Sequence, residues 1–541
     1  MGQQYKYLIE NSHGLLWRND PYARSITHDK SNNLNSVIAA STGTYTTPDY
    51  KMPNWNELVI YEMHIGSFIY DPKSPRKQGS FAAAIGKLDY LKNLGINAIE
   101  VMAVAEFDGD ISWGYNPAYI FAIEDEYGGP DGFRNFVNEA HKRDIAVILD
   151  VVYNHLGYPA DDMWDFDGWS QDGKGGIYFY EDWRSKTAWG DTRFDYGRGE
   201  VRQYLRDNAL RWLEQRFVDG LRWDSVGSIR NVKDQNNDPS DDIPDGWNLM
   251  QWINSLIQQR QPWKISIAED LKDDEWITKP VDAGGAGFDA QWGSAFLWTA
   301  RNALIGADDN ARDMNAVRDI IAQRYNSDAF ERVIYTESHD ADSNGQARLP
   351  EMIWPRKADS YFSKKRSTLG AALVFTSPGV PMIFMGQEFL EGGYFKNNPE
   401  ELDWSKAVKF SGILELYRDL IHLRRNWFNN TRGLCGQNVN VHHVNNNGKI
   451  IAFHRWDRGG SGDDVIVVIN FTSRGYSSYT IGFPRGGNWK VRFNSDWNGY
   501  SPDYQNWLSY EAEANGQPMD GMPCSGNVGI GPYTALILSQ D

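Results

Sequence analysis

Apolar and polar positions alternate at two different spacings along most of the chain. From residue 58 to residue 386, short β-branched or apolar runs predict strands over 58–63, 97–102, 145–152, 220–224, 264–269, 287–292, 332–338 and 380–386. Apolar residues at three- and four-residue spacing predict helices over 81–95, 131–144, 200–217 and 411–425. Eight strands that alternate with helices indicate an α/β fold whose parallel sheet closes as a (β/α)8 TIM barrel.

The pattern changes near residue 427. After about residue 430, alternating strand patterns separated by Gly, Asn and Ser turns predict a carboxyl-terminal antiparallel β-sandwich domain over 427–541. The barrel is expected over 51–426, with an Asp-, Gly- and Trp-rich insertion at about 156–199 of the kind that serves binding. The first segment, 1–50, holds one strand pattern and predicts a short amino-terminal β remnant.

Composition narrows the possible partners. The 541 residues carry 54 Lys and Arg against 72 Asp and Glu, a net charge of -18, and such a surface repels nucleic acid. The 22 Trp, 28 Tyr and 24 Phe exceed what core packing usually needs, and flat rings suit the faces of sugars. These counts exclude a nucleic-acid partner and favour a carbohydrate.

The cysteines and the start of the chain bear on localisation. Only Cys435 and Cys524 are present, too few for a disulfide framework, and no basic segment followed by an apolar run opens the chain. No apolar stretch is long enough for a membrane span, so no membrane partner is expected. These features predict a cytoplasmic protein, with secretion as the alternative if upstream residues were removed. The sequence does not indicate an oligomeric state.

Polar residues end four of the predicted barrel strands. The motifs are DVVYNH (150–155), GLRWD (220–224), AED (268–270) and ESHD (337–340). Reactive groups of a (β/α)8 barrel sit at the carboxyl ends of the strands, so we expect Asp224, Glu269 and Asp340 at one mouth.

Two of these carboxylates suit the cleavage of a glycosidic bond with retention. One carboxylate must attack the anomeric carbon while a second carboxyl group, about 5 Å away, protonates the leaving oxygen. We predict Asp224 as the nucleophile, kept ionised by Arg222 on the same strand face, and Glu269 as the general acid/base, its pKa raised by repulsion from neighbouring carboxylates. Asp340 would bind sugar hydroxyls and favour the oxocarbenium-like state.

Simpler interpretations exist for each residue alone. Any one acid could be a helix cap or a surface carboxylate, but four polar strand ends in this order disfavour that interpretation for the set. His155 and His339 could be metal ligands, yet no HxH or HExxH spacing accompanies them.

The four motifs resemble the signature regions of glycoside hydrolase family 13, the α-amylase family. The resemblance implies the catalytic roles given above for Asp224, Glu269 and Asp340, with Arg222, His155 and His339 contacting the sugar. Tyr115 in WGYNP looks like the family's stacking tyrosine. VIYEMHIGSF, GGAGFDAQW and MGQEF are most similar to the branching-enzyme and trehalohydrolase branch, whose amino-terminal carbohydrate-binding module is matched here only in its last part.

Three positions depart from the patterns of the family. Gly227 and Ser228 replace the Lys-His pair of typical secreted α-amylases, which argues against the usual calcium site although Asn154 matches one of its ligands. Branching enzymes usually carry one further acid directly after the acid/base and another directly after the stabiliser. This chain has the former, Asp270, but has Ala341 in place of the latter. No cofactor is expected to be required.

The sequence therefore favours a retaining hydrolase of α-1,4-linked glucans such as starch, glycogen and maltooligosaccharides. A 1,4-α-glucan branching enzyme is the alternative, because transfer uses the same glycosyl-enzyme intermediate. An inactive glucan-binding scaffold and a sucrose- or trehalose-directed enzyme are more remote alternatives.

Overall fold

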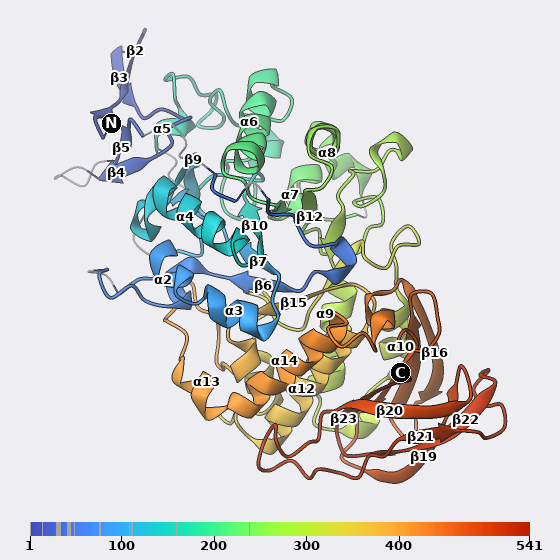
Figure 1. Ribbon diagram of the computed structural model, residues 1–541. Helices are drawn as coiled ribbons and strands as arrows, with labels where there is room; N and C mark the ends of the chain where they lie inside the picture. Colours follow the sequence, from blue (N-terminus) through green and yellow to red (C-terminus); the bar gives the residue numbers. More distant parts are fainter. Residues whose placement is uncertain are drawn as a thin grey trace.

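Eight parallel strands close into a barrel in chain order, which confirms the predicted fold. In the computed structural model, residues 2–12, 14–28, 34–39, 45–47, 49–74, 77–107, 109, 112–157, 161–236 and 238–541 are described. The barrel strands are β6 (Ile60–Met63), β7 (Ala98–Val101), β10 (Ala146–Val151), β11 (Gly220–Trp223), β12 (Ile265–Ala268), β13 (Ala290–Trp292), β14 (Arg332–Ile334) and β15 (Val380–Phe384). β15 pairs with β6 and closes the ring (Figure 1).

The helices predicted over 81–95, 131–144, 200–217 and 411–425 have ends within three residues of the predicted bounds, and the first of them is divided into two helices. Helices surround the barrel. They are α1 (Ile65–Phe68), α2 (Phe81–Ile85), α3 (Leu88–Leu94), α4 (Gly129–His141), α5 (Asp161–Trp164), α6 (Gly199–Gln215), α7 (Val226–Arg230), α8 (Pro244–Arg260), α9 (Ser294–Ile305), α10 (Met314–Ala322), α11 (Leu349–Ile353), α12 (Tyr361–Thr376), α13 (Ser405–Lys409) and α14 (Ser411–Arg424). The hairpin β8 (Ala105–Phe107) and β9 (Pro117–Ile123) precedes α4. Within the described ranges, no helix is both long and apolar enough to cross a bilayer.

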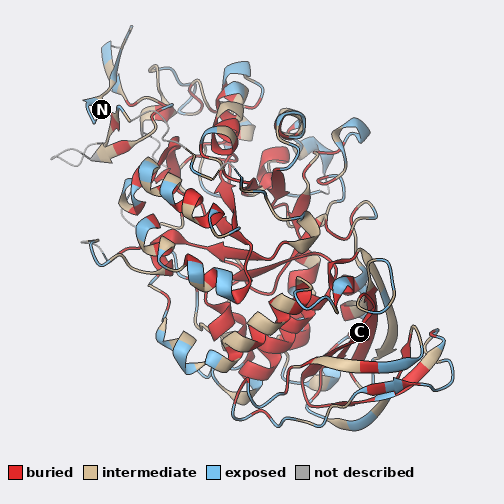
Figure 2. Ribbon diagram, in the orientation of Figure 1, coloured by how far each residue is buried: buried red, intermediate tan, exposed pale blue. Residues whose placement is uncertain are grey.

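The alternation of side chains along each strand separates two apolar cores. Residues such as Ile60, Ile148 and Ile267 belong to one cluster, which fills the inside of the barrel. Their neighbours on the other face, such as Tyr61 and Leu149, pack in a larger cluster with the helices. Because both faces of each strand are buried, the strands appear as continuous apolar runs in the sequence (Figure 2).

The turn after α3 shows how local sequence fixes the packing of two outer helices. Gly95 ends α3 in the left-handed region, at φ 101°, and its N–H donates to Leu91 and Lys92 of the last helical turn. A Cβ at Gly95 would lie 2.6 Å from Cγ2 of Ile421 on α14. Glycine is therefore required both by the backbone conformation and by the close approach of α14.

The two ends of the chain form separate β structures, far apart in Figure 1. At the amino end, β1 (Gln4–Tyr5), β5 (Leu34–Val37) and β4 (Ile26–His28) form one sheet, and β2 (Tyr7–Asn11) pairs with β3 (Gly14–Arg18). At the carboxyl end, a sheet of order β16-β17-β18-β23-β20-β21 faces the pair β19-β22 across a shared apolar cluster. Their bounds are β16 (Asn438–Asn445), β17 (Ile450–Trp456), β18 (Val465–Asn470), β19 (Tyr476–Phe483), β20 (Gly487–Asn494), β21 (Ala512–Ala514), β22 (Cys524–Ile530) and β23 (Thr534–Ser539). This antiparallel domain follows α14, as the change of pattern predicts.

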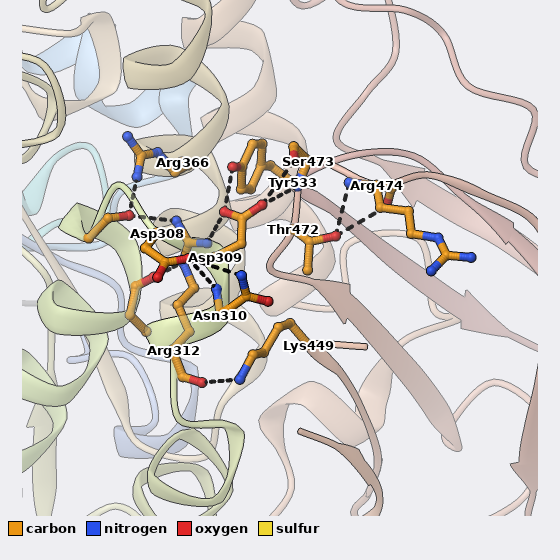
Figure 3. A network of polar contacts seen from close by, with 12 residues as sticks. Asp308, Asp309, Asn310, Arg312, Arg366, Lys449, Thr472, Ser473, Arg474 and Tyr533 are labelled. Carbon is orange, nitrogen blue, oxygen red and sulfur yellow. Dashed lines mark hydrogen bonds and ion pairs between the residues drawn. The ribbon is translucent and has the colours of Figure 1, made fainter. Parts of the chain in front are cut away.

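A polar network joins the barrel to the carboxyl-terminal domain (Figure 3). Asp309, between α9 and α10, accepts hydrogen bonds from the Tyr533 hydroxyl at 2.6 Å and from the Ser473 N–H at 2.8 Å, and it also pairs with Arg312. Lys449 donates back to the Arg312 carbonyl at 2.6 Å. The network therefore fixes the segment between α9 and α10 against three loops of the β domain.

A second contact across the same boundary is fully buried. Lys365 on α12 and Asp496 after β20 form an ion pair of 2.8 Å in which both side chains are 0% exposed. Asp496 also accepts the Trp507 N–H at 2.9 Å. Removing one partner of a buried pair leaves an uncompensated charge, so this pair is costly to break.

We predict that Lys365→Met destabilises the protein by about 3–5 kcal/mol, because Asp496 loses its buried cation. Thermal unfolding followed by circular dichroism measures the loss. Lys92→Met is the matched control, because Lys92 pairs with Asp144 on the exposed surface. Equal melting temperatures for the two variants would contradict the prediction.

Candidate active site

The inward-facing positions of the barrel change from apolar to charged toward the carboxyl ends of the strands. Ile60 is followed two residues later by Glu62, Ala98 by Glu100, Ile148 by Asp150 and Ile267 by Glu269. On β11 the same series gives Arg222 and then Asp224. Since alternate residues share a face, one end of the barrel interior is a cluster of charges.

Arg222 lies at the centre of this cluster. Its side chain is fully buried, and its Nη1 contacts Asp150 Oδ2 at 2.7 Å and Asp224 Oδ1 at 3.1 Å. Its Nη2 lies 3.0 Å from Glu269 Oε2. One guanidinium therefore holds the two predicted catalytic carboxylates and a third acid side by side.

Further contacts orient Asp224 and Glu269. Asn154 Nδ2 donates to Asp224 Oδ2 at 2.7 Å. Ser225 has the unusual φ of 39°, and its N–H donates to Glu269 Oε2 at 2.7 Å. A non-glycine residue in the left-handed region costs backbone energy, and here it directs the N–H after Asp224 at Glu269.

The surroundings of Glu269 favour its protonated form. Burial is the main cause that raises the pKa of Glu269 well above its ordinary range, and the charges of Asp224 and Asp340 raise it further, while Arg222 opposes them. The direction agrees with the prediction, but burial, rather than repulsion between carboxylates, is the main cause. A buried carboxyl group with a raised pKa can donate a proton at neutral pH.

His339 and Asp340 lie in the segment after β14, which ends at Ile334, four residues earlier than predicted. His339 Nδ1 bonds to Glu62, and its ring stacks on Tyr115 with centroids 4.8 Å apart. Burial would lower the pKa of His339, but the charges of Asp340 and Glu62 outweigh burial and raise it to about 9. The Asp340 side chain is 40% exposed, 3.6 Å from His339, and is therefore open to a ligand.

Tyr115 and His155 complete the set of predicted residues. The Tyr115 hydroxyl donates to Asp150 at 2.6 Å, and His155 Nε2 lies 2.9 Å from the Tyr115 carbonyl. The His155 ring stacks on Trp189 of the insertion at 4.6 Å, and burial lowers its pKa to about 4. Direct contacts thus join Arg222 to Asp224 and Glu269 in one set and join Asp340, His339, Tyr115 and His155 in a second, and Asp150 bridges the two sets.

Three further residues belong to the site but were not predicted. Asp150 holds Arg222 and Tyr115, and burial raises its pKa to about 7. Glu62 holds His339, and Trp189 covers His155. For Asp150 and Glu62 a signal was present in the sequence, because each is an acid within an otherwise apolar strand run.

Asn154, which matches a calcium ligand of the family, is occupied by other contacts. Its amide nitrogen bonds to Asp224, and its Oδ1 faces Nδ1 of His155. Across the described residues, no three His, Cys, Asp or Glu side chains are grouped so that they could hold a metal ion. The argument against a calcium site, which rests on Gly227 and Ser228, stays a prediction from the sequence.

A closed (β/α)8 barrel with paired acids at its mouth fits a glycosidase or transglycosidase. The sequence matches the family described as Alpha amylase, catalytic domain, over residues 67–411, and the Alpha amylase, C-terminal all-beta domain over residues 441–541. The chain belongs to the alpha-amylase family and is an α-glucan-active enzyme of that family.

Relatives within the family agree with the predicted branch. A malto-oligosyltrehalose trehalohydrolase of Saccharolobus solfataricus is 30% identical over 510 residues, which cover 82% of this chain and 81% of the relative. A 1,4-alpha-glucan branching enzyme of Rhodospirillum rubrum is 29% identical over 546 residues, covering 92% and 68%. The solved pullulanase type I of Bacillus subtilis, complexed with maltose, shares the fold with a TM-score of 0.75 at 19% identity, covering 99% and 77%.

We predict that Glu62→Gln lowers the pKa of His339, because it removes one of the two negative charges that raise it. A raised histidine pKa stabilises the fold below the unfolded value of about 6.5, and this contribution is lost as pH rises through about 9. Melting temperatures of the wild type and Glu62→Gln from pH 6 to 10 measure the difference, which should be largest at the acid end. Glu400→Gln, on the exposed surface, is the control, and a difference that does not change with pH would contradict the assignment.

Proposed function

We propose that this protein is a retaining glycoside hydrolase of α-1,4-linked glucans that acts through a covalent glycosyl-enzyme intermediate. The contact of one buried guanidinium, that of Arg222, with both Asp224 and Glu269 carries the proposal. Two carboxyl groups on the two nitrogens of one guanidinium fit the separation of about 5 Å in retaining enzymes better than the roughly 6.5–9.5 Å of inverting enzymes.

In the first step, Asp224 attacks the anomeric carbon while the glycosidic C–O bond breaks. The hydrogen bonds that Asp224 accepts from Arg222 and Asn154 fix the orientation of its carboxylate. Glu269 gives its proton to the leaving oxygen, which departs as an alcohol. The new bond joins the sugar to a carboxylate oxygen of Asp224.

In the second step, Glu269 acts as the general base. As a carboxylate it takes a proton from water, the water oxygen bonds to the anomeric carbon, and Asp224 leaves. The two inversions give net retention. The raised pKa of Glu269 supports both roles, because the group is protonated before the first step and regains a proton in the second.

The remaining residues suit the binding of the sugar at the cleavage point. His339 is held protonated and can donate a hydrogen bond, while the exposed carboxylate of Asp340 can accept bonds from sugar hydroxyls. Negative charge near the anomeric carbon also stabilises an oxocarbenium-like state. Tyr115 adds an aromatic surface beside His339.

Exposed tryptophans of the insertion, one of which stacks on His155, support a substrate longer than a disaccharide. Trp189, Trp169 and Trp183 of the insertion are all exposed. A cavity of 410 Å³ beyond Arg230 is lined by Trp247 and Trp276, and Arg230 pairs with Asp270 next to Glu269. These rings offer several stacking surfaces for the units of an α-glucan.

Hydrolysis is favoured over branching by the residues after the catalytic acids. Ala341 is buried in the apolar core inside the barrel, where branching enzymes of the family have an acid. The position after Glu269 does carry an acid, Asp270, but this carboxylate is buried and accepts hydrogen bonds from Arg230 at 2.8 Å and 3.0 Å. Branching transfer is the second candidate, because branching enzymes are among the relatives of the chain.

We predict that incubation with amylose releases reducing ends in parallel with the loss of iodine absorbance, because water accepts the glycosyl group. Both quantities are measured over time, and the products are then treated with a debranching enzyme. A loss of iodine absorbance without new reducing ends, followed by short chains only after debranching, would contradict hydrolysis and show branching.

We expect Asp224→Asn and Glu269→Gln each to lower kcat on amylose by roughly 10²–10⁴-fold, because each removes one of the two groups that make or break bonds. Initial rates of reducing-end release measure the change, and melting curves check folding. Glu400→Gln should retain full activity. Wild-type activity in Asp224→Asn would exclude Asp224 as the nucleophile.

A further inference from the structure

A cavity outside the barrel holds arginines that the mechanism does not use. It has a volume of 580 Å³ and lies between α6, α8 and the amino-terminal segment, where α6 and α8 run beside each other (Figure 1). Its lining includes Tyr22, Arg24, Phe121, Arg211, Trp252 and Arg260. The amino-terminal segment is anchored here, because the Tyr204 hydroxyl of α6 donates to the Pro21 carbonyl at 3.0 Å.

Arg211 is the unusual member of this group. It is only 7% exposed, and its Nη2 is buried without a hydrogen-bond partner. In the part of the chain that the structure describes, its guanidinium forms no ion pair, and its Cζ lies 5.5 Å from the centre of the Phe121 ring. A buried charge without a partner is costly, so a ligand that supplies the partner would bind favourably.

The charges around Arg211 increase this cost. Arg216, at the end of α6, is also buried, with its Nε unpaired, and Arg24 lies at the rim. Burial is the main cause that lowers the pKa of Arg211 to about 9, and repulsion from Arg216 and Arg24 lowers it further. The group stays protonated at neutral pH, so the cavity carries an uncompensated positive charge.

The acids of the cavity do not neutralise Arg211, because they are paired with other arginines. Asp207 contacts Arg206, and Glu214 lies 2.8 Å from Arg260. The whole chain has a net charge of -18, so this local excess of cations differs from the rest of the molecule. A hydroxyl group of a neutral glucan can accept a hydrogen bond from Arg211 but leaves its charge uncompensated, whereas the oxygens of an oxyanion compensate the charge and match the geometry of a guanidinium.

We propose that this cavity binds a phosphate-type oxyanion, with Arg211 as its buried contact and Arg24 as its contact at the rim. The anion links α6 to the amino-terminal segment, since Arg211 belongs to the first and Arg24 to the second. The source of the anion is free phosphate or the phosphate group of a sugar phosphate. Both sources share the same chemistry at Arg211.

Isothermal titration calorimetry in a phosphate-free buffer at low ionic strength tests the proposal. Inorganic phosphate, glucose 6-phosphate and, as the neutral control, glucose are titrated into the full chain. We expect one saturable site for the phosphate ligands and none outside the active site for glucose. Tighter binding of glucose 6-phosphate identifies a sugar phosphate, and equal or tighter binding of inorganic phosphate identifies the free ion.

Three variants locate the site. Arg211→Met should weaken phosphate binding about tenfold or more, because it removes a charge-assisted hydrogen bond, and should raise the melting temperature of the unliganded protein. Arg24→Met, at the rim, should also weaken binding and does not depend on core packing. Arg318→Met, whose arginine pairs with Asp319 on the surface, should bind as the wild type does. No saturable binding to the wild type, or unchanged affinity in Arg24→Met and Arg211→Met, would overturn the proposal.

Discussion

The contact of the buried Arg222 guanidinium with three carboxylates is the constraint on which the site depends. A cation inside a barrel of apolar side chains is stable only if acids accompany it, and Asp150, Asp224 and Glu269 supply them. The acids in turn need the cation, because burial favours their neutral forms. The barrel strands fix both partners in register, since Asp150 lies opposite Arg222 across the β10–β11 pair.

This mutual dependence explains how one small volume holds acids of different character. Asp224 receives hydrogen bonds from Arg222 and Asn154, which fix its orientation. Glu269 is buried near two other negative charges, which favours a carboxyl group that keeps its proton. Nucleophile and acid therefore differ because of their surroundings and not because of their residue types. The carboxyl-terminal domain is fixed to the barrel by the buried pair of Asp496 with Lys365 on α12 and by the hydrogen bond from Tyr533 to Asp309.

Much of the fold and part of the site could be predicted from the sequence. The barrel strands are recognisable because they are buried on both faces, and a polar residue that ends an apolar run marks the mouth. Asp150 and Glu62 were missed as members of the site because their partners, Arg222 and His339, are distant in sequence. The burial that raises the pKa of Glu269 and the isolation of Arg211 also depend on residues distant in sequence, so local patterns could not predict them.

The central claim is that Asp224 forms a covalent bond to the sugar while Glu269 supplies the proton. The most direct measurement incubates Glu269→Gln with α-maltotriosyl fluoride, whose leaving group needs no protonation, and then identifies the modified peptide by mass spectrometry after acid quenching and digestion. The account predicts a maltotriosyl group on the peptide that contains Asp224. Fluoride release with the sugar on another residue, or without any labelled peptide in a rapidly quenched sample, would contradict it.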